Sequence, residues 1–235
     1  MKINGLKIKV IRKKIKNVHL YVKPPFGNIV VTCPINYPDE SIKLFILTKL
    51  PWIRRQVESF KNQPRQSKRE FVSGETVYLL GKKYFLQVDY DNKKYSINII
   101  GHKINFIVRN GSTSKQREVI FNNWYRKILK EQLDILIPKI EEKTGLKCSK
   151  YTITNMQTKW GSCNIKTQRI NLNLQLAKVP ILGIEYVVLH ELAHTIEKTH
   201  NHKFKSILDK FMPTWREIKK LLNSQNISHY YKTKV

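Results

Sequence analysis

The 235-residue sequence contains few cysteines, few acidic residues and no long apolar run. Its three cysteines, Cys33, Cys148 and Cys163, include no C-x-x-C pair, which argues against a disulfide framework and against a cysteine-based metal site. No segment reaches the roughly 18 consecutive apolar residues that a membrane span needs, and none near the N-terminus is typical of a secretory signal. We therefore expect a cytoplasmic protein in a reducing compartment, with no membrane contact.

Acidic side chains are scarce. The sequence has 17 Asp and Glu residues and 44 Lys and Arg residues, which gives a formal net charge of +27 at pH 7. Such a charge attracts polyanions, so nucleic acid is a candidate partner. The basic residues are dispersed along the chain, and no fingerprint of a nucleic-acid-binding fold accompanies them. A solvated, lysine-rich surface explains the same composition, and the sequence does not decide between the two interpretations.

Alternating apolar segments predict a β-rich region over residues 1–112. Strands are expected at 6–11, 19–22, 28–32, 76–80, 83–88, 95–99 and 104–108. One helical insertion begins near Asp39 and runs towards Phe60, with acidic residues at its N-terminus. Pro51 is expected to kink or split this helix. The first region is therefore predicted to be a set of strands with one helical insertion.

The character of the chain changes at about residue 113. Apolar residues recur every three or four positions over residues 114–144, which predicts a long helix that ends at Gly145. Short strands are expected at 151–156 and 169–174, and helices at 181–198, 201–211 and 213–223. We predict an α+β protein with two parts, a β-rich N-terminal half (1–112) and a mostly helical half (113–235) that contains the chemistry.

The clearest chemical motif is the H-E-x-x-H pattern at residues 190–194. A helix brings positions i and i+4 to the same face, so His190 and His194 can converge on one zinc ion about 2.0–2.1 Å away. Glu191 does not bind the metal, but lies where it can accept a proton from metal-bound water. A helix with two buried structural histidines is the alternative. The apolar preceding turn and the small Ala193 favour the metal site.

A catalytic zinc ion needs a third protein ligand and an open coordination position. Glu197, His200 and His202 are the candidates just downstream of the motif. Glu197 is three residues after His194 and is expected to lie away from the face that holds the metal. His200 and His202 both follow a break at 198–199, and spacing alone leaves the choice between them open.

The chain resembles the YgjP-type zinc metallopeptidase family, a family of H-E-x-x-H zincins that is similar to the SprT-like proteases. The resemblance rests on Lys159-Trp160-Gly161-Ser162-Cys163, on residues 169–173 (RINLN) and 187–194 (VVLHELAH), on His200 and Phe204, on residues 212–216 (MPTWR) and on residues 51–53 (PWI). It implies a zincin-like catalytic half with one Zn²⁺ ion bound by His190, His194 and His200. Asn201-His202 replaces the family's common Gly-Pro, which leaves His202 as a competing ligand.

These features predict a zinc-dependent metallopeptidase that hydrolyses peptide bonds through a zinc-bound water activated by Glu191. Its expected substrate is a peptide or a protein. By similarity to other zinc peptidases, we expect the strand at 169–174 to form a sheet edge on which an extended peptide lies. Trp160 and Gly161 are expected near the cleft. Asn171 and Asn173 are candidate hydrogen-bond partners of a zinc histidine.

Two other functions compete with this prediction. A zinc-dependent phosphohydrolase acting on nucleoside triphosphates is favoured by the cationic surface and by a label that some family members carry. However, the chain has neither a G-x-x-x-x-G-K-[ST] loop nor a carboxylate cluster for Mg²⁺. A non-catalytic, zinc-containing nucleic-acid-binding protein would not need Glu191. Ser162 and Cys163 have no dedicated base, so a nucleophilic role is disfavoured.

Overall fold

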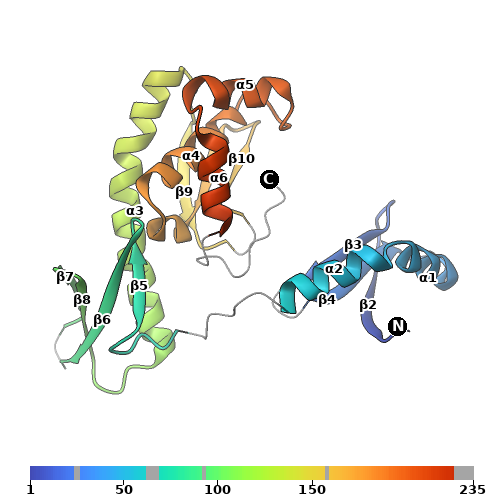
Figure 1. Ribbon diagram of the computed structural model, residues 1–235, viewed down its shortest axis with the longest axis horizontal. Helices are drawn as coiled ribbons and strands as arrows, with labels where there is room; N and C mark the ends of the chain where they lie inside the picture. Colours follow the sequence, from blue (N-terminus) through green and yellow to red (C-terminus); the bar gives the residue numbers. More distant parts are fainter. Residues whose placement is uncertain (24–26, 62–68, 92–93, 157–158, 225–235) are drawn as a thin grey trace. The chain divides into compact units, whose positions relative to one another are not determined.

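The computed structural model describes residues 1–23, 27–61, 69–91, 94–156 and 159–224 (Figure 1). The chain divides into two compact units, Met1–Arg65 and Gln66–Val235. In the described ranges it forms three mixed sheets and six α-helices, with strands mostly in the N-terminal half and helices mostly in the C-terminal half. The predicted α+β class is confirmed. No helix of the described residues is long and apolar enough to cross a membrane.

The first unit is a four-stranded sheet with two helices on one face (Figure 1). Its strands β1 (Lys2–Ile3), β2 (Leu6–Lys13), β4 (Asn28–Pro34) and β3 (His19–Lys23) are neighbours in that order, and β2 is parallel to β4. Helices α1 (Asp39–Thr48) and α2 (Leu50–Lys61) follow. The core between the helices and the sheet consists of Ile8, Ile29, Val31, Cys33, Ile42, Ile46 and Ile53. The other face of the sheet is left without a helix of this unit.

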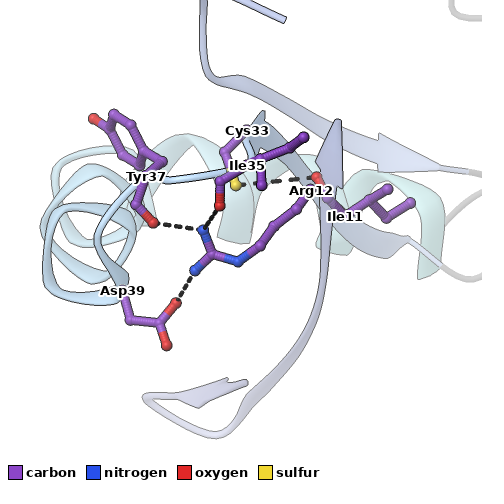
Figure 2. Close-up of polar contacts among 6 residues, drawn as sticks. All are labelled: Ile11, Arg12, Cys33, Ile35, Tyr37 and Asp39. Atoms are coloured by element: carbon purple, nitrogen blue, oxygen red, sulfur yellow. Dashed lines mark hydrogen bonds and ion pairs between the residues drawn. The ribbon is translucent and has the colours of Figure 1, made fainter. Parts of the chain in front are cut away.

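Arg12 fixes the connection between β4 and α1 (Figure 2). One of its terminal nitrogens, Nη1, donates to the carbonyl oxygens of Ile35 (2.9 Å) and Tyr37 (2.6 Å). The other, Nη2, is 2.6 Å from Oδ1 of Asp39, in the first turn of α1. A carboxylate in that turn also complements the positive end of the helix dipole. The helical insertion therefore begins where the sequence predicts.

The division of this insertion into α1 and α2 is also confirmed. Helix α1 ends at Thr48 and α2 begins at Leu50, so that Pro51 lies in the first turn of α2. Proline is tolerated there because the backbone amide that it lacks has no partner within a first helical turn, whereas in a helix interior it would remove a hydrogen bond.

The second unit begins with a sheet that packs against a long helix. Strands β5 (Thr76–Leu79), β6 (Lys82–Tyr90), β8 (Lys103–Val108) and β7 (Ser96–Ile100) are neighbours in that order. Helix α3 (Ser114–Thr144) starts with a capping box between Thr113 and Gln116, and ends at Gly145 with a φ of 73°. Phe106 of β8 packs edge-on against Phe121 of α3, with 5.5 Å between ring centroids.

The change at residue 113 is therefore a change of element type within one compact unit. The apolar faces of β5–β8 and of α3 bury each other in the core that also contains the later helices. A sheet face and a helix stripe each need such a partner. The compact units divide at Arg65 instead, so the predicted division into 1–112 and 113–235 does not coincide with them.

A second sheet of this unit places β11 (Arg169–Asn173) in its centre. The order is β10 (Gly161–Asn164), β11, β9 (Lys150–Thr154), with β10 antiparallel and β9 parallel to β11. The expectation that residues 169–174 form the sheet edge was wrong, because both sides of β11 are already paired. The edge strands are β9 and β10, and β10 was not predicted from the sequence.

Three helices complete the unit: α4 (Ile181–Ala193), α5 (His202–Phe211) and α6 (Trp215–Ser224). Helix α4 is buried along most of its length, and Gly183 allows α6 to approach it, since a Cβ there would lie 2.9 Å from a methyl carbon of Leu222. A short 3-10 helix, η1 (Leu174–Lys178), precedes α4 and accepts backbone hydrogen bonds from Leu80 and Gly81 at the β5–β6 turn. Helix α4 therefore packs against α6 and follows directly on a segment that is hydrogen-bonded to the β5–β6 turn.

Candidate metal centre

The motif residues lie at the C-terminal end of α4. His190 and His194 are one helical turn apart and therefore share a face. The chain leaves the helix at His194, and His200 returns to this face just before α5 begins. Asn201 sets that start, because its side-chain oxygen accepts a hydrogen bond from the backbone N–H of Phe204 at 3.0 Å. The departure from the family's common Gly-Pro thus provides a helix cap.

The three histidines converge on one point. Nε2 of His200 lies 3.1 Å from Nε2 of His194 and 3.1 Å from Nε2 of His190. Two ligand nitrogens on a tetrahedral zinc ion, each 2.0–2.1 Å from the metal, are about 3.3–3.4 Å apart. The spacing of the imidazole nitrogens therefore fits a metal ion, and three imidazoles are a donor set that zinc and several other divalent ions accept.

The protonation of the rings also fits metal binding. Nδ1 of His194 donates to the carbonyl oxygen of Glu197 at 2.9 Å, which leaves the lone pair of Nε2 directed at the other two histidines. Burial, followed by the neighbouring His194 and His200, lowers the pKa of His190 to about 3. Burial and then His194 also lower the pKa of His200. Neutral imidazoles with free lone pairs are the form that binds metal.

Phe204 supports all three imidazoles from α5. Its ring centroid is 4.9 Å from that of His190, 4.6 Å from that of His194 and 4.7 Å from that of His200. The side chain is 2% exposed, so it restricts the rings on the side away from solvent. The H-x-x-x-F spacing was visible in the sequence, but the contact with all three rings was not.

Glu191 lies next to His190 and is largely buried. The residue is 5% exposed, and burial, partly offset by the Lys159 ammonium, raises the pKa of its carboxyl group to about 8. Among the described residues, its Oε2 has no hydrogen-bond partner. Buried carboxyl groups with shifted pKa values are typical of sites where protons are exchanged.

A cavity of about 290 Å³ opens at these groups. One wall is strand β10 with the preceding Lys159 and Trp160, and the other is the face of α4 that carries His190 and Glu191. Lys198 and His200 complete the lining. Two of the residues expected near the cleft, Trp160 and Gly161, therefore line this cavity.

The two asparagines of β11 make their hydrogen bonds elsewhere. Nδ2 of Asn173, a fully buried residue, donates to the carbonyl oxygens of Met156 (3.0 Å) and Lys159 (2.7 Å). Oδ1 of Asn171 accepts from the hydroxyls of Thr152 and Thr154, at 3.1 and 2.9 Å. Within the described part of the chain, neither side chain is hydrogen-bonded to a histidine. Asn173 instead holds the segment that leads into the cavity wall.

The other candidate ligands lie outside the three-histidine group. His202 is the first residue of α5, and its Nδ1 is 3.4 Å from the hydroxyl oxygen of Ser206. Glu197 contributes its backbone carbonyl to His194. Of the described histidines, cysteines and carboxylates, the group that could hold a metal consists of His190, His194 and His200.

Two further residues of the cavity wall have informative surroundings. Tyr186 lies one turn before His190, with 5.8 Å between the rings, and its buried hydroxyl has no hydrogen-bond partner in the described ranges. Tyr186 was not among the predicted site residues, although its position four residues before His190 was a signal in the sequence. Burial, and then Glu191, raise the pKa of the Cys163 thiol to about 11, so Cys163 carries its proton at neutral pH and is a poor nucleophile.

Comparison with known proteins identifies the family of the chain. The family model described as YgjP-like, metallopeptidase domain, matches residues 16–225. The chain is similar to the metallopeptidase zymogen of Pyrococcus abyssi abylysin (20% identity, 38% of this chain and 90% of that chain, TM-score 0.36). It is also similar to that of Methanocaldococcus jannaschii jannalysin (25%, 39% and 93%, TM-score 0.35). No curated protein matches. Because the family model covers most of its length, the chain belongs to the YgjP-like metallopeptidase family.

Proposed function

We propose that this chain is a zinc-dependent metallopeptidase in which His190, His194 and His200 hold one zinc ion and Glu191 acts as the general base. The observation that carries the proposal is the convergence of three imidazole nitrogens beside a buried carboxylate, at the wall of a cavity. Family membership supports the metallopeptidase class and a metal ion. The described carboxylates add no further ligand to the group.

The chemistry divides between the metal and the protein. Bound zinc supplies a Lewis acid, which polarises a carbonyl group and acidifies water. Glu191 accepts the proton of the attacking water and delivers it to the leaving amide nitrogen. Burial of Glu191 favours proton uptake, because desolvation raises the pKa of its carboxyl group above the usual range. Gly161 holds the carboxylate in place, because its backbone packs directly on Glu191.

Strand β10 supports an extended peptide as the substrate. It is the edge strand of its sheet, and three of its residues, Gly161, Ser162 and Cys163, line the cavity. An edge strand offers unpaired backbone N–H and C=O groups to which a peptide can add as a further strand. The peptide bond would then pass between β10 and the face of α4 that bears Glu191.

The proposal is tested by comparing the zinc-loaded protein with its Glu191→Gln variant on an unstructured protein substrate. Glutamine keeps the size of the side chain against Gly161, so zinc content should be unchanged. Loss of the general base should lower the rate about 10²–10⁴-fold. Equal cleavage by both proteins would exclude the assigned role of Glu191.

A parallel assay with nucleoside triphosphates addresses the phosphohydrolase alternative, since Lys159 and Lys198 line the cavity. Triphosphate hydrolysis that depends on Glu191, without any proteolysis, would replace the peptidase proposal. Zinc binding without either activity would favour a non-catalytic role.

A further inference from the structure

Within the described part of the first unit, no helix packs on the second face of the sheet, which we term the open face. Side chains alternate between the two faces of a strand, and Ile8, Ile29 and Val31 mark the face that packs on α1 and α2. The strand register then places Lys2, Lys7, Lys9, Lys13, His19, Tyr21 and Lys23 on the open face, around Ile11, Val30 and Thr32. Its lysines are exposed.

The open face carries positive charge without compensation. Residues 1–65 contain 14 basic and three acidic side chains. The three acidic residues, Asp39, Glu40 and Glu58, all belong to α1 and α2. Since those helices lie on the opposite face, none of the three carboxylates of residues 1–65 lies on the same face as the lysines of β1, β2 and β3. The open face therefore favours a polyanion.

Two aromatic rings distinguish this face from a merely basic surface. His19 and Tyr21 are two residues apart on edge strand β3 and therefore lie on the same face. Their ring centroids are 6.3 Å apart, with 27° between the ring planes. The Tyr21 residue is 45% exposed, and the ammonium of Lys23 lies 5.9 Å from its ring centroid. Exposed rings on a sheet face, with cations beside them, are the arrangement on which unpaired bases stack.

The positions of the charges and the rings are complementary to a nucleotide chain. Lys9 of β2 and Tyr21 of β3 flank Val30 of β4 from opposite sides. Neighbouring strands are about 4.8 Å apart, so the two residues are about 10 Å apart across the sheet. Phosphates can therefore lie over the β2 lysines while the attached bases reach the rings of β3. Bases in a duplex are already stacked on each other and cannot do this.

We propose that the open face binds single-stranded nucleic acid, with phosphates on Lys7 and Lys9 and bases on Tyr21 and His19. This binding goes beyond the proposed hydrolysis and does not depend on the metal centre. An anionic membrane shares the attraction to lysines, but it gives no role to a pair of rings lying along a strand.

The test measures fluorescence anisotropy of labelled oligothymidine and oligouridine with the full-length protein. Lys7→Gln/Lys9→Gln removes two charges from the open face, and Lys43→Gln/Arg54→Gln removes two from exposed positions of α1 and α2. We expect the first pair to weaken binding at least about tenfold, and to reduce the slope of log K against log salt by about 1.4, or 0.7 for each phosphate contact. The second pair should change neither quantity appreciably.

Tyr21 provides the second arm of the test. Tyr21→Ala should weaken binding by about tenfold, within the range for loss of one base–aromatic stack, whereas Tyr21→Phe should bind as the unchanged protein does because it retains the ring. Equal losses of oligonucleotide affinity in the two double variants would overturn the proposal. So would an affinity for duplex DNA equal to that for the single strands, if Tyr21→Ala also had no effect. Binding to phosphatidylserine vesicles that requires Lys7 and Lys9, without oligonucleotide binding, would also overturn it.

Discussion

Gly161 and Glu191 are in direct contact: a Cβ atom on Gly161 would lie 2.6 Å from Oε1 of Glu191 and 2.7 Å from its Cγ. No side chain fits between edge strand β10 and the carboxylate. The strand backbone therefore sets the position of Glu191. The strand proposed to bind the peptide is thus in contact with the carboxylate proposed to accept the proton of the attacking water.

Gly161→Ala should disable the enzyme without removing the metal. The added methyl group must displace Glu191 or strand β10, and a shift of about 1 Å in a catalytic group can lower the rate about 100-fold. We expect a loss of this size in kcat, with unchanged zinc content. Gly183→Ala is the control, since it introduces the same group on α4 but against Leu222. If Gly161→Ala retained full activity, the contact would have no catalytic consequence.

His200 and His202 provide a matched pair for the third ligand. His200→Gln should weaken zinc binding by more than about 100-fold, which is the upper end of the loss caused by removing a residue that only supports a ligand. His202→Gln should leave zinc affinity unchanged, because His202 lies outside the three-histidine group. Competition with a chromogenic chelator measures both. The reverse order of effects would assign the third position to His202.

Phe204 is expected to couple stability to metal affinity. Phe204→Ala should lower the free energy of unfolding of the metal-free protein by about 3–5 kcal/mol, and should also weaken zinc binding because the three rings lose their common support. Phe121→Ala removes an equally buried ring that packs among Phe71, Phe106 and Tyr125. It should cost similar stability, measured by urea unfolding, with zinc affinity retained. Equal zinc affinity in both variants would contradict the supporting role of Phe204.

The sequence predicted the parts of the site that depend on local geometry. The spacing of His190 and His194 on one helix is sufficient to bring their rings together, and the periodicity of residues 114–144 defined α3 with its left-handed Gly145. The third histidine could not be chosen from spacing, since its approach depends on where α5 begins. That start is set by Asn201, which has a role only once the chain has folded back.

Sheet order was not visible in the sequence. Ile170 and Leu172 alternate with Asn171 and Asn173, a pattern that suits a half-exposed edge strand, yet β11 is central and its asparagines bond to β9 and to the segment after it. The edge strand that lines the cavity, β10, reads Gly-Ser-Cys-Asn, which has neither β-branched residues nor alternation. Pairing between distant segments decided both positions, and no local pattern records it.

The stability of the second unit should depend on the pH range in which Lys178 titrates. Its ammonium lies 5.5 Å from the ring centroid of Tyr125, and burial, followed by repulsion from Arg69, lowers the pKa of Lys178 from 10.5 to about 8. Between these pH values the unfolded chain holds a proton that the folded protein has released. The free energy of unfolding should therefore rise with pH over this window.

Lys178→Met removes this titration. We expect the variant to be about 1–3 kcal/mol more stable than the unchanged protein at pH 7, where burying the charge has its full cost, and the difference to shrink towards pH 10. Urea unfolding at the two pH values measures it. A difference that stays constant, or grows with pH, would show that the ammonium is not buried at a cost.

X-ray absorption at the zinc edge of the loaded protein would show whether three histidine side chains hold one zinc ion. We expect three imidazole nitrogens at about 2.0–2.1 Å with one further light-atom ligand, and the loss of one imidazole in His200→Gln. A sulfur ligand at about 2.3 Å, as a cysteine would supply, or an unchanged spectrum in His200→Gln, would contradict it.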